Sequence, residues 1–435
     1  MSDSRDMRAI ARDIFQHALT QASIPSAFAR HIEFERGVLR VCDDLYHFAG
    51  YSNVFVVSFG KAAHSMLEAL QSRMGSGLQG IVVGVVDPPS QLHGFRYFLG
   101  GHPLPTAESV RAGEAILRAL EAQTQPSLVI FLLSGGGSSL VEKPIDDEIS
   151  LPELIQTYRV LVHSGAPISD INAIRKHLSA TKGGRLAQAA APAQQISIMV
   201  SDVPDNALDA LASGPTMPDT SSVEDCHRIV THYNMLPDFP SPVRELFEKH
   251  ALEETPKSDD PAFVRSRWWP ILSNISARDA AAEHAALHRF AVEIDNCCDD
   301  WDYARAADYL LGRLRELGKG VSRACLISGG EVTVKVTNGG TGGRNQQFAL
   351  YCAEKIAGEN IAVLSAGTDG IDGNSPAAGA LVDGSTISRA KDRGLDPGAA
   401  LAHFDAFPLF ERLGDSILTG PTGNNLRDLR ILLAY

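Results

Sequence analysis

The chain contains 435 residues, of which 44% are hydrophobic, so it can bury a large core and its length predicts two or three domains. Its 52 acidic and 39 basic residues give a net charge of -13, and no basic cluster carries interleaved aromatic residues, which excludes nucleic acid and anionic membranes as expected partners. No apolar run approaches membrane-spanning length, and six cysteines without a CxxC pair fit a reducing compartment. We expect a cytoplasmic protein in which the adjacent Cys297 and Cys298 are buried thiols.

The first part of the chain alternates short apolar runs with helical patterns. The runs are continuously apolar, as strands covered on both faces would be. They predict strands at residues 53–60, 80–87, 128–137 and 195–203. Helices are predicted between them, among others at residues 107–122 and 171–191. The alternation predicts an α/β fold built on a parallel sheet with helices on both faces.

A proline-rich, charged stretch at residues 237–262 marks the expected domain boundary, which divides the chain into domains 1–262 and 263–435. The second domain is again α/β, and its glycine-rich turns and an expected hairpin predict a sheet with strands of mixed direction. Its predicted strands cover residues 270–274, 289–295, 324–336 and 361–367. Its predicted helices cover residues 277–288 and 302–317.

Glycines and small polar residues follow three of the predicted strands. Lys61 follows Gly60 after the first strand, and Asp202 lies at the end of the fourth. The third strand ends in a glycine–serine loop formed by Ser134, Gly135, Gly136, Gly137, Ser138 and Ser139. Loops at the carboxyl ends of parallel strands bind ligands, and N–H groups, a helix N-terminus and hydroxyls suit a phosphate or a carboxylate. The alternative for each loop is a tight strand–helix turn with serine caps.

Standard nucleotide-binding motifs are absent from these loops. Neither Gly-Lys pair, at 60–61 or 318–319, has the upstream glycine and following hydroxyl residue of a Walker A motif. The sequence GGGSSL keeps two glycines of a dinucleotide fingerprint but has Leu140 in the place of the third. The GxSxG nucleophile motif is also missing.

A predicted helix carries cations beside glycine. Arg175, Ser179 and Lys182 share one face of it, and Lys182 precedes Gly183 and Gly184. Two glycines inside a helical pattern destabilise it, which indicates that backbone approaches another element or a ligand closely there. A solvated polar face is the alternative explanation.

The stretch NGGTGGRNQQ sets four glycines, among them Gly342 and Gly343, directly before Arg344, Asn345 and Gln346. Bare backbone lets an anion approach, and the guanidinium fork of Arg344 fits a carboxylate or a phosphate. The two amides can form hydrogen bonds with hydroxyl groups. The alternative for Arg344 is a structural ion pair across domains.

Asp369 and Asp372 lie in a glycine-containing loop after the predicted strand 361–367. Paired carboxylates in such a loop hold Mg²⁺ or accept a proton. A calcium loop is not expected, because Leu381 occupies the position of its closing glutamate. The alternative is Asx-turn chemistry, since Asp and Gly are common turn residues.

Motifs from about residue 55 to the end of the chain occur in one order: SFGKAA, GGHPLPTAES, SGGGSSL, INAIRKHLSATKGGRLA, SGGEVTV, GTGGRNQQFAL, GTDGIDG and TGPTGNNLRDLRILL. In these motifs the chain resembles the class II glycerate kinases, the glycerate 2-kinases whose C-terminal part is called the MOFRL domain. The resemblance implies a Rossmann-like N-terminal domain, a smaller α/β C-terminal domain and an active site in the cleft between them. It also implies that ATP and D-glycerate react to give ADP and 2-phosphoglycerate, with Mg²⁺ or another divalent metal.

The resemblance and the loop chemistry together suggest roles for the candidate residues. Lys61 and Arg344 are the expected catalytic cations, and Asp202 or Asp369 is expected to hold the metal or to take the proton of the 2-hydroxyl. The remaining groups are expected to bind ATP or substrate: the glycine–serine loop from Ser134 to Ser139, Arg175, Lys182, Gly342, Gly343, Asn345 and Gln346. His102 and His177 lie in the motifs and are structural or catalytic.

The chain departs from the family pattern at two places. Asp205 and Asn206 follow SDV where the family has a Gly-Asp pair, and Pro376 stands where many members have Asp. These departures make Asp202 and Asp369 better metal candidates than the carboxylates beside them.

Two alternative functions stay open. Some members of the family carry the label hydroxypyruvate reductase, so an NAD(P)H-dependent reductase is the first, although the broken dinucleotide fingerprint argues against it. A non-catalytic sugar-acid-binding protein is the second, and it would keep the anion loops without needing Lys61. We expect a monomer or a homodimer whose partners are D-glycerate and ATP.

Overall fold

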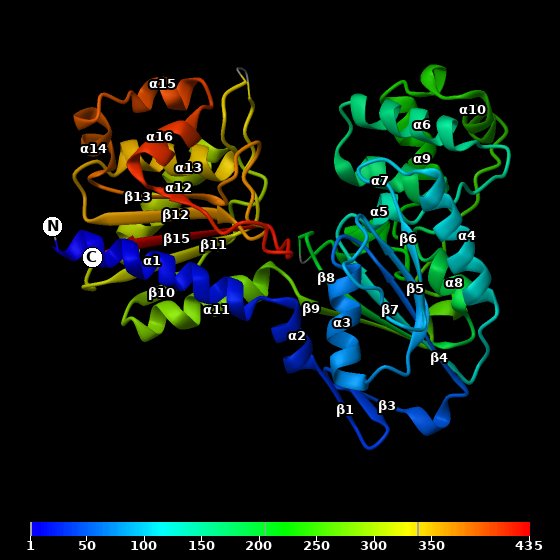
Figure 1. The fold of residues 1–435 in the computed structure, drawn as a ribbon. Coiled ribbons are helices and arrows are strands. Elements are labelled where there is room, and N and C mark those ends of the chain that lie inside the picture. Colours follow the sequence, from blue (N-terminus) through cyan, green and yellow to red (C-terminus); the bar gives the residue numbers. More distant parts are fainter. Residues whose placement is uncertain (1, 205, 337–338) are drawn as a thin grey trace. The chain divides into compact units, whose positions relative to one another are not determined.

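The computed structural model describes residues 2–204, 206–336 and 339–435. The chain divides into two compact units. The N-terminal unit is Ala27–Ile271, and the C-terminal unit is Met1–Ser26 together with Leu272–Tyr435. Each unit is an α/β structure with its own six-stranded sheet (Figure 1). Among the described residues, none of the helices combines the length and the apolar composition that a bilayer span requires.

The sheet of the N-terminal unit has the strand order β6-β5-β4-β7-β8-β9. Strands β4 to β8 pair in parallel, which confirms the predicted parallel sheet. Every residue of the central strand β7 is buried, and Val129 and Phe131 pack in a core with α4 and α8. Because strand side chains alternate, Ile130 and Leu132 face the opposite side, and α3 packs against the same strand. The strands are β4 (Asn53–Phe59), β5 (Gln79–Gly84), β6 (Phe95–Leu99), β7 (Ser127–Ser134), β8 (Gln194–Val200) and β9 (Ser266–Leu272).

A small sheet and a helical layer complete the N-terminal unit. Strands β1 (Ile32–Glu35), β2 (Val38–Val41) and β3 (Asp44–His47) form an antiparallel sheet that the sequence patterns did not indicate. Helices α6, α7, α9 and α10 enclose a hydrophobic cluster of their own. The helices are α2 (Ile24–His31), α3 (Ala63–Met74), α4 (Ala107–Glu121), α5 (Gly137–Leu140), α6 (Leu151–His163), α7 (Ile168–His177), α8 (Arg185–Ala190), α9 (Val223–His232) and α10 (Ser241–Glu248).

The helix predicted at residues 171–191 is two helices, α7 and α8, so that prediction was wrong between residues 178 and 184. The backbone N–H groups of Gly183 and Gly184 donate to Ser213 O and Gly214 O at 3.0 and 2.7 Å. These bonds tie the segment to another loop and take the place of helical hydrogen bonds. The glycine pair therefore serves contact with a neighbouring element, and residues 175 and 182 do not share a helix.

The sheet of the C-terminal unit has the strand order β10-β11-β15-β12-β13-β14. Strands β10 and β11 pair in parallel and the other neighbours of the described residues are antiparallel, which confirms the predicted mixed sheet. Helices α1 and α11 pack on one face and α12, α13 and α16 on the other (Figure 1). The strands are β10 (Ala291–Ile294), β11 (Ala324–Gly329), β12 (Ile361–Gly367), β13 (Gly379–Asp383), β14 (Ser416–Ile417) and β15 (Asp428–Ala434). The helices are α1 (Ser2–Gln21), α11 (Asn274–Leu287), α12 (Tyr303–Leu317), α13 (Arg344–Lys355), α14 (Thr386–Asp392), α15 (Pro397–Ala402) and α16 (Ala406–Leu413).

Helix α1 belongs to the C-terminal unit, whereas the sequence placed residues 1–26 in the first domain. Its buried side chains, among them Ile14 and Phe15, pack in one core with α11 and the C-terminal sheet. Arg8 adds ion pairs to Asp383 at 3.1 Å and Asp415 at 2.5 Å. The amphipathic pattern of this segment predicted a helix, but it carried no information about which sheet the helix covers.

The run EVTVKV, residues 331–336, is not the strand that its alternation predicts. Within it only Thr333 forms an isolated bridge, to Asp302. Thr333 N donates to Trp301 O at 2.8 Å, and Tyr303 N donates to Thr333 O at 3.0 Å. These two hydrogen bonds form a single bridge in place of the continuous hydrogen-bond ladder of a β-strand. This segment therefore forms no hairpin among its described residues, whereas the consecutive strands β12 and β13 pair in antiparallel fashion.

The six cysteines are free thiols, as the missing framework spacing predicts. Cys298 is buried, but Cys297 is exposed, so the expectation of two buried thiols was wrong for Cys297. The backbone N–H of Cys297 donates to Asp295 Oδ1 at 2.9 Å in the turn after β10, where the chain reaches the surface.

Candidate active site

The loops with Lys61, with the glycine–serine run and with Asp202 follow β4, β7 and β8, which are neighbours in a parallel sheet. All three therefore start at the same edge of the sheet. Lys61 N donates to Gly135 O at 2.9 Å, and Ala62 N donates to Ser134 Oγ at 3.0 Å. The structure thus brings together loops that are more than seventy residues apart in sequence.

The Lys61 side chain is exposed and lies against the glycine–serine loop. A methyl group built on Gly136 would come within 3.1 Å of Lys61 Cγ and 3.2 Å of Lys61 Cε. Among the described residues, no carboxylate forms an ion pair with Lys61. Its ammonium is therefore a cation beside the glycine–serine loop, and no carboxylate among the described residues neutralises its charge.

The carboxylate of Asp202 closes the other side of this loop. A Cβ atom on Gly135 would lie only 1.8 Å from Asp202 Oδ2, so the carboxylate occupies the space that any side chain at this position would need. Asp202 is half-buried. Glycine at 135 is thus required for the close approach of a carboxylate to backbone, at a point that also adjoins Lys61.

The hydroxyls of the glycine–serine loop are engaged by the protein. Ser134 Oγ accepts the hydrogen bond from Ala62 N, and Ser138 Oγ lies 2.9 Å from Ser213 Oγ. Ser139 Oγ donates to Gly136 O at 3.4 Å. Helix α5 has only four residues, so its dipole is smaller than the helix N-terminus expected at this position. An anion bound here would rely mainly on loop N–H groups and on Lys61.

The two motif histidines have different surroundings. His102 lies within reach of the loop, because a methyl group on Gly136 would be 3.2 Å from His102 Cδ2. Burial and the positive charge of Lys61 lower the pKa of His102, so its imidazole is neutral near pH 7. His177 is fully buried, and its Nδ1 lies 2.8 Å from Ala173 O. The structure therefore adds His102 to the site and gives His177 a structural position.

Lys182 and Arg175 are already engaged by protein groups. Lys182 is 1% exposed, and its ammonium contacts the fully buried carboxylate of Glu142. Glu142 also accepts hydrogen bonds from Tyr158 Oη at 2.6 Å and Ser179 Oγ at 2.5 Å. The guanidinium of Arg175 lies 4.8 Å from the centre of the Tyr158 ring. Anion binding by these two residues stays a prediction, and the geometry favours a structural role.

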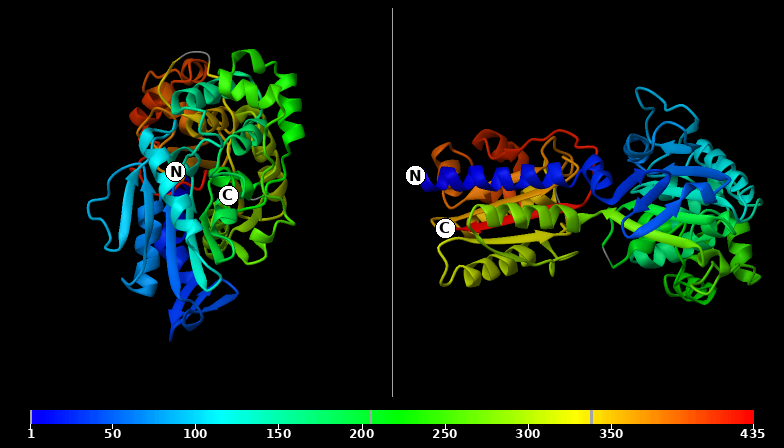
Figure 2. Two further views of the ribbon diagram at one scale, coloured as in Figure 1. Left: turned by 90° about the vertical axis from the view of Figure 1, so that its right-hand side faces the viewer. Right: turned by 90° about the horizontal axis from the view of Figure 1, so that it is seen from below.

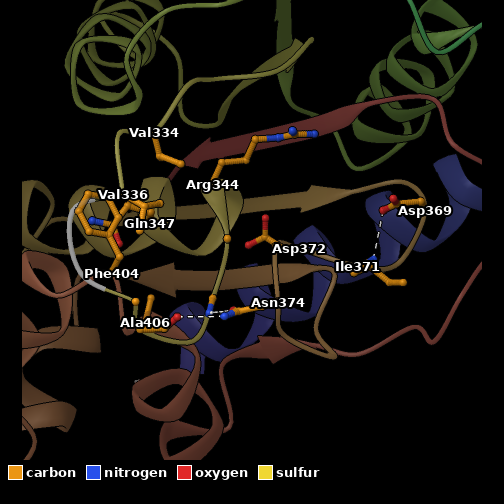
Figure 3. Close-up of a pocket in the computed structure, with 15 residues that line it drawn as sticks. Val334, Val336, Arg344, Gln347, Asp369, Ile371, Asp372, Asn374, Phe404 and Ala406 are labelled. Carbon is orange, nitrogen blue, oxygen red and sulfur yellow. Dashed lines mark hydrogen bonds between the residues drawn. The ribbon is translucent and has the colours of Figure 1, made fainter. Parts of the chain in front are cut away.

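The C-terminal unit contains a pocket of about 530 Å³ at the start of α13 (Figure 3). Its polar lining includes Arg344, Gln347, Asp369, Asp372 and Asn374. The glycines predicted to bind an anion, Gly342 and Gly343, form part of its wall. Val334, Val336, Ile371, Phe404 and Ala406 contribute apolar surface.

The carboxylate of Asp372 is bound by the start of α13, where Gly343 is followed by Arg344, Asn345 and Gln346. Its carboxylate accepts hydrogen bonds from the backbone of Asn345 and Gln346 at 3.0 and 2.9 Å, and from their side-chain amides at 3.4 and 3.0 Å. A Cβ atom on Gly343 would lie 2.3 Å from Asp372 Oδ1, so only glycine leaves room. Asn345 and Gln346 are buried around this carboxylate, which does not fit the prediction that they bind substrate hydroxyls.

Asp372 titrates at a higher pH than an ordinary carboxyl. Burial raises its pKa to about 6, although the hydrogen bonds from Gln346 and Asn345 act in the opposite direction. The side chain is 2% exposed and lines the pocket. The structure therefore provides a carboxylate that gains and loses its proton near neutral pH at the pocket wall.

Arg344, the first residue of α13, forms its fork with a carboxylate of the same unit. Its Nε and Nη2 donate to Asp428 Oδ2 and Oδ1 at 2.6 and 3.0 Å, and Nη2 lies 2.8 Å from Glu331 Oε1. The side chain of Arg344 is 34% exposed to solvent. Arg344 is thus ion-paired within the C-terminal unit, whereas the alternative explanation placed its ion pair across domains. Any ligand anion would have to share this guanidinium.

Asp369 takes part in the turn chemistry that was its alternative explanation. Its Oδ1 accepts the backbone N–H of Ile371 at 3.1 Å, which is an Asx turn (Figure 3). Asp369 is half-buried and also lines the pocket. Asp202 lies in the N-terminal unit and Asp369 in the C-terminal unit. Asp205, the other carboxylate considered, lies outside the described residues.

Three charged residues at the start of β15 are linked to Arg344 through ion pairs with Asp428 and Glu331, and the sequence patterns gave them no role. Asp428 binds Arg344, and Arg427 forms a bidentate pair with Asp299 at 2.7 and 2.6 Å. Arg430 is fully buried and donates to two backbone carbonyls of the segment after β11. The signal was present, since the motif LRDLRILL places three charges in an otherwise apolar strand.

Comparisons with known proteins cover nearly the whole chain. A domain of unknown function, DUF4147, matches residues 10–248, and the MOFRL family matches residues 324–428. D-glycerate 2-kinase of Thermotoga maritima is 36% identical over 389 residues, which are 87% of this chain and 90% of that protein. A protein of Agrobacterium vitis with a provisional hydroxypyruvate reductase name is 35% identical over 87% of this chain and 86% of its own. The solved structure of glycerate kinase from Thermotoga maritima matches with a TM-score of 0.87 and 31% identity, over 99% of this chain and 100% of that chain.

Proposed function

Because the chain belongs to the class II glycerate kinase family, which joins a DUF4147 domain to a MOFRL domain, we propose that it is an ATP-dependent glycerate 2-kinase. The reaction transfers the γ-phosphoryl group of ATP to the 2-hydroxyl of D-glycerate and gives ADP and 2-phosphoglycerate. The names of the relatives from Thermotoga maritima support glycerate as the acceptor. We also propose that the enzyme is a monomer or a homodimer and that it is cytoplasmic. The six free thiols agree with a reducing compartment.

One observation carries the mechanism: the Lys61 side chain lies against Gly136, the Lys61 backbone N–H donates to Gly135 O, and Lys61 forms no ion pair with a carboxylate of the described residues. In phosphoryl transfer the protein forms few or no covalent bonds with the substrates. It positions the two substrates and neutralises the charge that moves with the phosphoryl group. Loop N–H groups bind phosphate oxygens, and Lys61 neutralises them. An unpaired cation is suited to this task because binding the phosphate breaks no existing ion pair.

The carboxylate best suited to a divalent metal is Asp202. Mg²⁺ is usually held by one or two carboxylates together with substrate phosphates and waters. Asp202 is half-buried and adjoins the loop proposed to bind phosphate, which fits that pattern. Asp369 is the second candidate, with one oxygen already accepting from Ile371 N. When bound, the ion supplies positive charge to the phosphate oxygens, while Lys61 and the loop fix their position.

The acceptor side of the reaction uses the pocket of the C-terminal unit. Arg344, held in place by Asp428, presents its remaining exposed surface to the carboxylate of glycerate. Asp372 is the group best suited to take the proton of the 2-hydroxyl, because its pKa of about 6 lies close to neutral pH. Asn345 and Gln346 position Asp372 and do not bind the substrate themselves.

A product assay tests the proposal. The purified protein receives D-glycerate, ATP and Mg²⁺, and the products are separated into 2- and 3-phosphoglycerate; a parallel reaction contains hydroxypyruvate and NAD(P)H. Formation of 2-phosphoglycerate supports the proposal, whereas nucleotide oxidation without phosphorylation would favour the reductase. Binding of D-glycerate with neither reaction would favour a sugar-acid-binding protein.

The role of Lys61 has a matched control. Lys61→Ala should lower kcat/KM for phosphorylation by about a hundredfold or more, because a preorganised charge at the phosphate is lost. Lys249→Ala removes another exposed lysine of the same unit, at the C-terminal end of α10, and should leave the rate unchanged. Equal rates for the two variants would exclude Lys61 from the mechanism.

A further inference from the structure

Helices α1 and α11 lie side by side on one face of the C-terminal sheet, as the right-hand view of Figure 2 shows. Each carries two polar residues spaced by four positions at their contact. Asp13 and His17 are one turn apart on α1, while His284 lies in the last turn of α11 and His288 is the residue that caps its C-terminal end. Residues at this spacing project from the same side of a helix. Four side chains capable of binding metal thus meet at one helix–helix seam, away from the pocket residues.

Three of these side chains converge on one point. His284 Nε2 lies 2.8 Å from Asp13 Oδ2, and His288 Nε2 lies 3.0 Å from the same oxygen. The three ligand atoms all lie within 4.8 Å of one another. Asp13 is 57% exposed, His288 30% and His284 18%, so an ion in solution can reach the cluster.

The neighbouring groups orient the cluster. The ring of His17 stacks on His284 with centres 4.1 Å apart and planes at 9°, which holds the His284 ring with its Nε2 toward Asp13. Hydrogen bonds from His284 and His288 lower the pKa of Asp13, so its carboxylate is anionic at neutral pH. His284 Nδ1 is buried and has no hydrogen-bond partner among the described residues. Stacking therefore replaces the hydrogen-bonded support that strong zinc sites usually have.

We propose that Asp13, His284 and His288 bind one divalent transition-metal ion of the zinc type. Two imidazoles and one carboxylate select Zn²⁺, Co²⁺, Ni²⁺ or Cu²⁺ over Mg²⁺ and Ca²⁺, which prefer oxygen ligands. Two histidines spaced by four on a helix are a known way of presenting imidazoles to one such ion. The ion takes the place of the two hydrogen bonds to Asp13, and water completes its coordination.

Binding at this seam would connect segments that are 271 and 275 residues apart in sequence. Helix α1 is held to the C-terminal unit by its apolar face and by the ion pairs of Arg8. A metal that binds only the folded seam stabilises it by mass action, so the thermal midpoint should rise with metal concentration. The site thus acts as a clamp on α1 that is independent of the proposed reaction.

The test uses the full chain, stripped of metal and kept in excess Mg²⁺ so that oxygen-ligand sites are occupied. Zn²⁺ is titrated by calorimetry, and Co²⁺ is titrated while its visible absorption is recorded. We expect one ion per chain with micromolar affinity, a Co²⁺ spectrum typical of nitrogen and oxygen ligands, and a rise in the thermal midpoint. Absence of binding in the native chain would overturn the proposal and leave a hydrogen-bonded His–Asp–His cluster.

Substitutions locate the ion. His284→Gln and His288→Gln should each weaken binding at least tenfold and remove the rise in the thermal midpoint, while glycerate phosphorylation stays normal. The matched control is His250→Gln, because His250 is an exposed histidine whose ring stacks on that of His227 with centres 4.6 Å apart. Among the described residues, His250 belongs to no group of side chains that could hold a metal ion together. Circular dichroism checks that each variant is folded. Unchanged binding in both test variants would place the metal elsewhere and refute the site.

Discussion

Lys182→Met distinguishes a structural lysine from a ligand-binding one. The side chain is 1% exposed, and its partner Glu142 is fully buried. Removing the lysine leaves a buried carboxylate with hydrogen bonds from Tyr158 and Ser179 but without a counter-charge. Breaking a buried ion pair in this way costs about 3–5 kcal/mol of unfolding free energy. Native proteins are usually stable by about 5–15 kcal/mol, so this loss would be a large part of the total and easy to measure.

Urea unfolding followed by tryptophan fluorescence measures this loss, since Trp268 and Trp269 belong to the same unit as Lys182. Steady-state kinetics of glycerate phosphorylation is measured on the folded protein in parallel. The double variant Glu142→Gln with Lys182→Met removes both charges. It should therefore lose less stability than the sum of the two single variants.

The two roles of Lys182 predict opposite results. A structural lysine gives Lys182→Met a large stability loss with nearly normal KM for ATP and D-glycerate. A ligand-binding lysine gives a stability within about 1 kcal/mol of the native protein and a raised KM. The second result would refute the structural role and restore the binding role that the sequence suggested.

Three further substitutions test the two loops. Gly135→Ala should lower kcat/KM by about tenfold or more, because the new methyl group overlaps the carboxylate of Asp202; kinetics measures it. Arg344→Lys should cost about 1–3 kcal/mol in urea unfolding and lower kcat/KM, because lysine cannot form the two-pronged contact with Asp428. Asp372 has a pKa of about 6 in the folded chain against an ordinary 3.8, so its protonated form is favoured and the stability it contributes is lost as pH rises from 4 to 7. Asp372→Asn should remove about 2 kcal/mol of that fall in unfolding free energy, measured by urea unfolding at each pH.

Controls keep these results specific. Gly77→Ala places a methyl group in open space and should leave both rate and stability unchanged. A normal rate for Gly135→Ala would show that Asp202 does not depend on this close approach. An Arg344→Lys variant with normal kinetics would exclude Arg344 from substrate binding. Equal pH dependence of stability in the native protein and Asp372→Asn would mean that Asp372 titrates as an ordinary carboxyl.

The sheets and the strand-end loops could be predicted because their signals are local. Continuous apolar runs identify strands buried on both faces, and the parallel order of β4, β7 and β8 then brings their loops to one edge. The failures arise where tertiary contacts override local pattern. The alternating run 331–336 has only one bridging residue, at Thr333, and the helical pattern 171–191 is interrupted where backbone bonds to residues 213 and 214.

The anion at the start of α13 could not be identified from sequence, because the protein supplies it. Glycines followed by amides led us to expect a ligand anion at a helix N-terminus, and binding of such a ligand stays a prediction. The anion is Asp372, 26 and 27 residues beyond the amides that bind it. Nothing in the spacing separates an internal carboxylate from a bound phosphate, because both use the same N–H groups.

The same argument orders the three candidate site cations that lie beside glycine, Lys61, Lys182 and Arg344. Lys182 is paired with Glu142, 40 residues away, and Arg344 with Asp428, 84 residues away. Pairing over such distances is a property of the fold and leaves no local trace in sequence. Lys61 alone among these three has no carboxylate partner in the described part of the chain. Because a neutralised cation attracts a phosphate less strongly than a free one, the sheet edge of the N-terminal unit is the place where the proposed phosphoryl transfer gains most from the protein.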